Sequence, residues 1–195
     1  MNSADDWRER LTGKLEPILR ERDPRPAISS YHDMPYAIFR YPPDAEFAVR
    51  QEVALLRTRL QAAGKRVTTI SLAECLQEAL EAADLTTEDL ADAERRVGLP
   101  ETIETIGQVL SDYQPLDGLV AAKLPADADA LRDVVFIVRA GALFPLYRTH
   151  ALMEQLRGQL KVPAVLFYPG TIEGPTGLRF MGVLDAEHNY RPKIF

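Results

Sequence analysis

The first hydrophobic residues of the chain recur at the spacing of one helix face. Between residues 6 and 19 the apolar side chains lie four positions apart, which predicts an amphipathic helix that packs on the rest of the protein. These side chains are Trp7, Leu11, Leu15 and Leu19. Residues 21–35 contain three prolines among polar, turn-forming residues, and we expect an ordered connector or a lid there.

Two strand–helix pairs follow this connector. Residues 36–41 are β-forming residues followed by two prolines and an aspartate, which predicts a strand and then a helix start. The helix is expected over residues 45–63, because its apolar residues step by four, three and four and Gly64 stands where a left-handed C-terminal cap belongs. Residues 67–70 predict a second strand, and Ser71, with a glutamate three positions later, has the spacing of a capping box that opens the next helix.

The second half of the chain predicts another strand–helix–strand unit. Residues 133–139 include five consecutive large apolar residues, which is typical of a strand that is buried on both faces. A helix is expected over 146–160 and a strand over 162–168. The next strand, over 178–184, follows after only nine residues, whereas a parallel return needs about a dozen or more. We therefore expect this last pair of strands to be antiparallel.

These elements predict an α/β fold. The expected architecture is a mostly parallel sheet with helices on both faces and one antiparallel strand near the C-terminus. Residues 85–116 are expected to form two helical pieces separated near Gly98. The signals between residues 112 and 132 are mixed, and a strand over 119–122 is one alternative there.

Length, charge and cysteine content restrict the class of protein. A chain of 195 residues favours one domain, 1–195, on which the N-terminal helix and connector, 1–35, dock. The net charge of −6 disfavours direct, sequence-specific nucleic-acid binding, which needs clustered positive potential. A single cysteine, Cys75, cannot form an internal disulfide, and no apolar stretch approaches about 20 residues. We expect a cytoplasmic protein without a membrane segment.

Candidate catalytic and metal-binding residues are scattered. The three histidines, His32, His150 and His188, have no metal-ligand spacing with one another or with Cys75, so no metal site is predicted. No Gly-x-Ser-x-Gly motif is present, and Cys75 falls within a predicted amphipathic helix as a small apolar residue. The glycines of 170–177 lack the lysine and the following helix of a phosphate-binding loop, which favours a hairpin loop. We therefore expect no catalytic residues and no cofactor.

An alternative hypothesis uses the turns at the strand ends. Open α/β sheets bind ligands beyond the carboxyl ends of their strands. In this alternative the protein is a nucleotide-responsive or phosphoryl-handling enzyme, with an arginine as the phosphate contact and an aspartate as the cation contact. Its candidate ligand-binding residues are Arg139, Gly141, Gly170 and Asp185.

Large aromatic residues and prolines also gather at the predicted strand ends. One interpretation is that they cap the core. The other is that Phe144, Tyr168 and Pro169 form an apolar patch that binds another protein, because aromatic residues and arginine are enriched in interface hot spots. Tyr190 and Arg191 near the C-terminus are expected to join this patch.

Several short motifs, in this order, resemble the BrxB family of BREX bacteriophage-exclusion systems. Weaker similarity extends over residues 36–44, so that the resemblance covers most of the chain. The motifs that carry it are Gly141 to Leu146, Val165 to Gly170, Leu178 to Gly182 and Asn189 to Arg191. Where the family is expected to end in a sequence like Tyr-Arg-Ala-Phe, this chain has Tyr-Arg-Pro-Lys at 190–193.

The resemblance implies a non-catalytic component of a bacterial, cytoplasmic defence system. It implies a fold similar to P-loop or Rossmann-like domains that lack the phosphate-binding loop, and it supplies no catalytic residues. The partner that it implies is the phosphatase-like protein PglZ, together with other BREX proteins. The implied function is that of an assembly factor or adaptor that supports host DNA methylation and phage exclusion.

Overall fold

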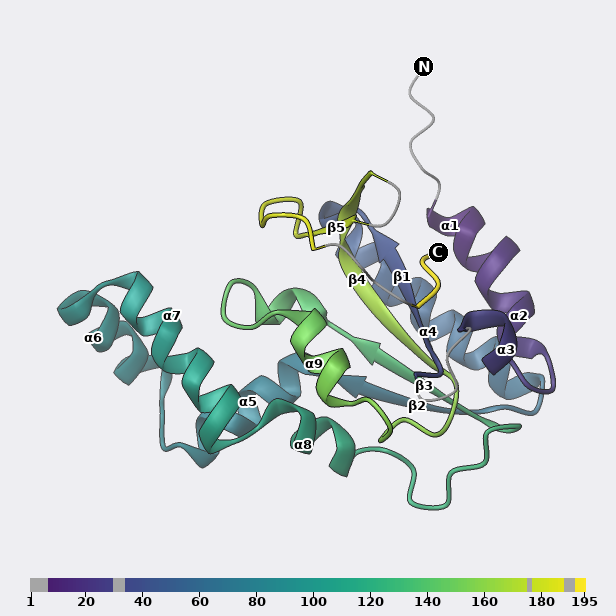
Figure 1. Ribbon diagram of the computed structural model, residues 1–195, viewed down its shortest axis with the longest axis horizontal. Coiled ribbons are helices and arrows are strands. Elements are labelled where there is room, and N and C mark those ends of the chain that lie inside the picture. Colours follow the sequence, from purple (N-terminus) through teal and green to yellow (C-terminus); the bar gives the residue numbers. More distant parts are fainter. Residues whose placement is uncertain (1–6, 30–33, 175–176, 188–191) are drawn as a thin grey trace.

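The computed structural model describes residues 7–29, 34–174, 177–187 and 192–195, and these form an α/β structure (Figure 1). The strands are β1 (Tyr36–Tyr41), β2 (Arg66–Ser71), β3 (Asp133–Val138), β4 (Ala164–Glu173) and β5 (Gly177–Phe180). The helices are α1 (Trp7–Glu9), α2 (Glu16–Arg20), α3 (Arg25–Ile28), α4 (Glu46–Ala62), α5 (Leu72–Ala82), α6 (Thr87–Val97), α7 (Leu99–Gln108), α8 (Leu116–Ala122) and α9 (Thr149–Gln155). Short 3-10 turns cover Pro43–Ala45 and Ala140–Leu143, and π-helical turns cover Arg10–Leu15 and Val109–Tyr113.

Four parallel strands form the sheet in the order β1-β4-β3-β2. The strand β5 is antiparallel to the outer half of β4, as the short connection predicts. The free edge of β1 is covered by the C-terminal residues, because the Ile38 amide donates to the Lys193 carbonyl at 2.9 Å and the Phe195 amide donates to the Ile38 carbonyl at 2.9 Å. The strand β2 forms the opposite edge of the sheet.

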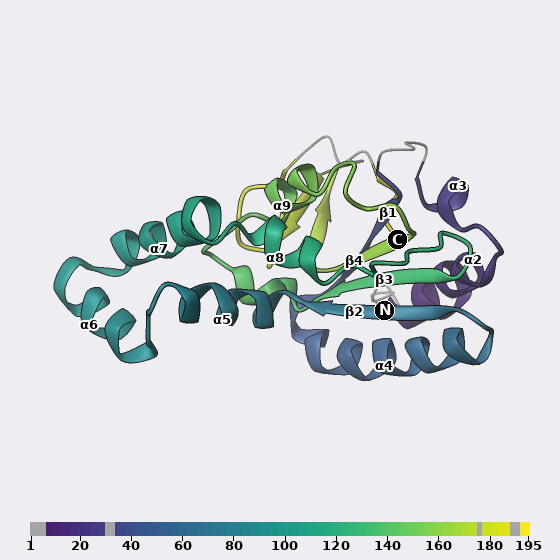
Figure 2. The same ribbon diagram turned by 90° about the horizontal axis from the view of Figure 1, so that it is seen from below.

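The central strands are buried on both faces, as the unbroken apolar run in β3 predicts. On β3, Val134 and Phe136 face a core beneath α4, whereas Val135 and Ile137 face a core beneath α5, α8 and α9. Figure 2 shows α4 on one side of the strands and α8 and α9 on the other. The helices α6 and α7 extend beyond the carboxyl ends of the strands, and α6 has no buried residue.

The N-terminal apolar stripe packs beside α4, as its spacing predicts. Its four members are fully or nearly fully buried in the same core as α4 and the inner residues of β1. The contact includes an ionic group, in which Glu16 accepts hydrogen bonds from Arg59 Nε at 2.9 Å and from Arg20 Nη2 at 2.7 Å. Of the predicted connector, residues 25–28 form α3, and residues 30–33 lie outside the described residues.

Local capping also follows the sequence. Gly64 has a φ of +87°, the left-handed conformation expected after α4. The Ser71 side chain accepts a hydrogen bond from the backbone amide at position 74, which opens α5. A complete, reciprocal capping box opens α6, where Thr86 and Asp89 each bond the other's backbone amide.

Several predicted boundaries are wrong, including the end of the strand expected over 162–168, which β4 extends to Glu173. The helix expected over 146–160 is limited to α9, because a 3-10 turn and extended residues precede it and turns follow it. The strand expected over 178–184 ends at Phe180, because Met181 and Gly182 adopt left-handed φ angles of 54° and 70°. Residues 119–122 belong to helix α8, not to a strand.

Candidate functional site

The carboxyl end of β4 carries three of the predicted site residues, Tyr168, Pro169 and Gly170. There β4 runs past the end of its other neighbours and pairs with β5 from Gly170 to Glu173. The backbone amide of Met181, just after β5, donates to the Pro169 carbonyl at 2.9 Å. The β4–β5 pairing and this bond fix the hairpin of β4 and β5 to the end of the sheet. The hairpin lies beside the 3-10 turn that follows β3.

Three aromatic rings stack at this end. The Phe144 ring lies 6.0 Å from the Phe180 ring, edge to face, and the Phe180 ring lies 5.3 Å from the Tyr168 ring. Tyr168 is fully buried and Pro169 is also buried, whereas Phe144 is half-buried. The prediction that Tyr168 and Pro169 belong to a surface patch is therefore wrong, because β5 and the turn after it cover them. Tyr168 is linked to Phe144 through the Phe180 ring, which contacts both.

The two glycines of the predicted ligand-binding set differ in how closely they are packed. A Cβ atom on Gly170 would lie 2.4 Å from the Arg179 carbonyl oxygen on β5 and 2.4 Å from Cε1 of Tyr168. A Cβ atom on Gly141 would lie 3.5 Å from Met181 Sδ, which is an ordinary contact distance. Gly170 is thus required for the close approach of β5 to β4.

The exposed apolar side chains at this end are different from the predicted ones. Ile172 is 45% exposed and Val183 is 67% exposed, and Pro145 is also exposed. Together with the half-buried Phe144 on the turn after β3, we call these side chains the carboxyl-end surface: Phe144, Pro145, Ile172 and Val183. Sequence reasoning missed Ile172 and Val183, because the extension of β4 and the end of β5 decide which of their residues face outward.

The four residues of the ligand-binding alternative do not share one cavity. Arg139 lines a pocket between α4 and the sheet, together with Thr69 and Phe167. Asp185 lines a separate, small cavity beside the ion pair of Arg148 and Glu187, whose atoms lie 2.9 Å apart. The fold therefore does not bring Arg139 and Asp185 together. They cannot serve in one site as the phosphate contact and the cation contact.

Tyr190 and Arg191, like His32 and His188, lie outside the described residues. Cys75 is fully buried on α5, and burial raises the pKa of its thiol to about 11, as suits a core residue. Within the described part of the chain, no group of three or more His, Cys, Asp or Glu residues is placed to hold a metal ion. None of the described helices is both long and apolar enough to cross a bilayer.

Comparison with known proteins identifies the family. The family described as BREX protein BrxB matches residues 68–194, which is more than half of the chain. The chain belongs to the BrxB family. A curated relative, BREX protein BrxB of Bacillus cereus (strain H3081.97), is 26% identical over 162 residues, which is 82% of each chain. No solved structure shows significant similarity.

The residues that match the BrxB family include one candidate site completely and the other in part. It begins inside β2 and includes β3, β4, β5 and the whole carboxyl-end surface. Arg139 also lies within it. The helix α4, which forms the other wall of the Arg139 pocket, precedes the BrxB match.

Proposed function

We propose that this chain is a non-catalytic assembly component of a BREX phage-defence system and that it binds the phosphatase-like protein PglZ. In this proposal it acts as an adaptor that supports host DNA methylation and phage exclusion. The observation that carries the proposal is the carboxyl-end surface, where apolar side chains are exposed on a hairpin and a turn that hydrogen bonds fix to the sheet. Membership of the BrxB family supports a role beside other BREX proteins.

The physical argument is one of preorganisation. Exposed apolar side chains on flexible segments lose conformational freedom when they bind, whereas side chains on a fixed framework lose less. Phe144 is supported by the Phe180 ring, and Ile172 is held by the pairing of β4 with β5. Binding would bury these side chains and gain hydrophobic free energy at a low entropic cost.

The test is co-elution of the purified chain with purified PglZ at micromolar concentrations, followed by titration. We expect Val183→Asp and Ile172→Asp each to weaken the affinity about tenfold or more, because each places a charge in an apolar interface. Both side chains are exposed, so the fold and the melting temperature should be retained.

The matched control is Leu55→Asp on α4. Leu55 is 52% exposed and lies outside the carboxyl-end surface, so this variant should bind PglZ as the unchanged chain does. Absence of any complex at micromolar concentrations contradicts the PglZ proposal itself. A complex that Leu55→Asp weakens while Val183→Asp and Ile172→Asp do not would contradict the choice of surface.

A further inference from the structure

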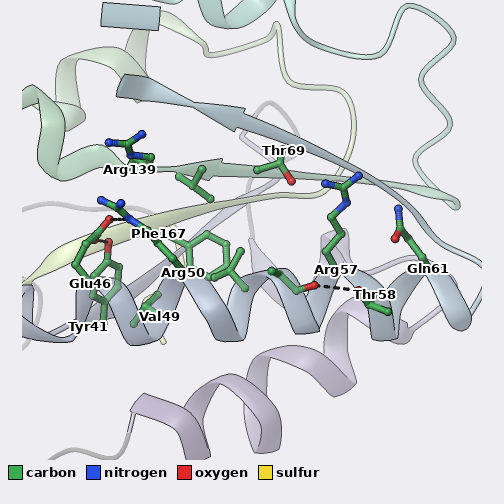
Figure 3. A pocket seen from close by; sticks show the side chains of 13 residues that line it. Tyr41, Glu46, Val49, Arg50, Arg57, Thr58, Gln61, Thr69, Arg139 and Phe167 are labelled. Atoms are coloured by element: carbon green, nitrogen blue, oxygen red, sulfur yellow. Dashed lines mark hydrogen bonds and ion pairs between the residues drawn. The ribbon is translucent and has the colours of Figure 1, made fainter. Parts of the chain in front are cut away.

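The pocket between α4 and the sheet has features that the adaptor function does not use. Its volume is about 500 Å³, within the range of roughly 300 to 1,000 Å³ that is typical of small-molecule sites. Valines of α4 and β3, together with the Phe167 ring on β4, form its apolar floor. Figure 3 shows three arginines around this floor: Arg50 and Arg57 on α4, and Arg139 at the end of β3.

The charge of the pocket is opposite to that of the protein. The chain as a whole carries −6, whereas the charged residues that line the pocket are three arginines and one glutamate, Glu46. Glu46 is already engaged, because its Oε1 accepts from Arg50 Nε at 2.8 Å and its other oxygen accepts from the Tyr41 hydroxyl. No carboxylate of the described residues therefore neutralises Arg57 or Arg139.

Arg139 is held in the pocket at some cost in backbone energy. It is half-buried, and its Nε is buried without a hydrogen-bond partner among the residues that the structure describes. Its φ of 59° lies in the left-handed region, which costs a non-glycine residue about 1–2 kcal/mol. Strained residues of this kind cluster at ligand-binding positions. The strained backbone and the unpaired Nε both single out Arg139 among the residues that line the pocket.

The arginines lie at two ends of an elongated pocket. Arg57 follows Arg50 by seven residues, which is about 10 Å along a helix axis. In Figure 3, Arg139 lies above Arg50 at one end, whereas Arg57 points toward Thr69 at the other. Thr58 and Gln61 add neutral polar groups beside Arg57. The apolar floor lies between the two ends.

We propose that this pocket binds a small organic phosphate with an aromatic part, of the nucleotide class. The phosphate group binds at the Arg139 end, where guanidinium groups can donate paired hydrogen bonds to phosphate oxygens. The aromatic part lies on the floor beside Phe167, and its polar edge meets Arg57, Thr58, Gln61 and Thr69. The Arg139 end of the pocket lies at the carboxyl end of β3, close to where open α/β sheets bind their ligands, and the rest of the pocket runs along the face of the sheet beneath α4.

Calorimetric titration of the full chain tests this proposal, with AMP and ATP as probes and with adenosine and inorganic phosphate as the two halves of the ligand. We expect AMP or ATP to bind, and to raise the melting temperature, with at least tenfold higher affinity than either half alone. Absence of binding by both nucleotides at millimolar concentration would overturn the proposal.

Two variants and one control assign the site. Arg57→Gln changes an exposed helix residue, and Arg139→Asn introduces a residue that tolerates the left-handed conformation. Each should raise the dissociation constant of the nucleotide about tenfold or more, because a hydrogen bond to a charged group is lost. Arg96→Gln on α6, an exposed arginine outside the pocket, should leave it unchanged.

Two further outcomes would contradict the proposal. Binding that neither Arg57→Gln nor Arg139→Asn weakens would place the ligand elsewhere on the chain. An acidic peptide that binds more tightly than AMP and ATP, and that loses its affinity in both variants, would show that the pocket serves a protein partner and not a small phosphate. Arg57 lines the pocket and is not part of the carboxyl-end surface, so the Arg57→Gln result tests the pocket separately from PglZ binding.

Discussion

Gly170→Ala is the substitution for which the structure gives the sharpest expectation. The added Cβ would lie 2.4 Å from the Arg179 carbonyl oxygen and 2.4 Å from Cε1 of Tyr168. Neither neighbour can retreat easily, because the carbonyl belongs to the backbone of β5 and the Tyr168 ring packs against Phe180 at 5.3 Å. Overpacking of this kind costs about 1–3 kcal/mol. For a chain of this length, that corresponds to a fall in melting temperature of roughly 3–9 °C.

Thermal and urea denaturation, followed by circular dichroism, measure this effect. Gly141→Ala is a control in the same region, because its Cβ would meet Met181 Sδ at 3.5 Å and should change the stability by no more than about 0.5 kcal/mol. Gly118→Ala, in helix α8 with no atom within 4 Å of the new Cβ, should stabilise the chain by about 0.5–1 kcal/mol. A Gly170→Ala variant as stable as the unchanged chain would refute the packing role that we assign to this glycine.

Two further predictions concern ionisable groups. Burial by itself raises the pKa of Glu16, but hydrogen bonds from Arg59 and Arg20 outweigh it and lower the pKa below its ordinary value of 4.5. The stabilisation from this carboxylate is therefore present above about pH 4.5 and is lost as the pH falls through the lowered pKa. Urea denaturation should show Glu16→Gln about 2 kcal/mol less stable than the unchanged chain at pH 7. The difference should shrink as the pH falls through the lowered pKa of Glu16, and a difference that does not change with pH would contradict this assignment. The Cys75 thiol is fully buried, and burial raises its pKa to about 11. It should therefore react with a thiol reagent only when the chain unfolds. Labelling of the native protein at the rate of a free thiol would contradict its place in the core.

Hydrophobic spacing predicts most of the framework, because burial acts on every turn of a helix and every second residue of a strand. The stripe from Trp7 to Leu19 has four apolar positions at helical spacing, and β3 has five apolar residues in a row. Each pattern is long enough to predict one kind of element. The antiparallel pairing of β4 and β5 follows from chain length alone, since nine residues cannot make a parallel return. Gly64 marks the end of α4 because an αL cap disfavours residues that have a Cβ.

The errors arise where one residue's backbone conformation overrides the side-chain pattern. Residues 178–184 look apolar enough for a strand, yet the positive φ angles of Met181 and Gly182 turn the chain after Phe180. The sequence also predicts Tyr168 at the surface, because an aromatic residue before Pro-Gly is typical of a strand end. In the structure β4 continues to Glu173, and β5 covers the ring.

The candidate sites were less predictable than the fold, because each combines residues that are distant in the sequence. The place of Arg139 at a strand end makes it a candidate ligand contact, and in the structure it lines a pocket. Its partners Arg50 and Arg57 lie on the exposed side of a helix pattern, where an arginine is ordinarily a solvated residue. Only the path of α4 across β2 and β3 brings these three guanidinium groups around one apolar floor.

The two proposed sites meet at one turn, and this determines how their tests can be separated. Arg139 and Phe144 flank the 3-10 turn of residues 140–143, so Arg139 contributes to the pocket and Phe144 to the carboxyl-end surface. A substitution at Arg139 can therefore disturb both sites through the backbone of this turn. Arg57 and Val183 each belong to one site alone, so Arg57→Gln and Val183→Asp measure nucleotide binding and PglZ binding independently. An effect of Arg139→Asn on PglZ affinity that Arg57→Gln does not share would come from the turn and not from the loss of a ligand.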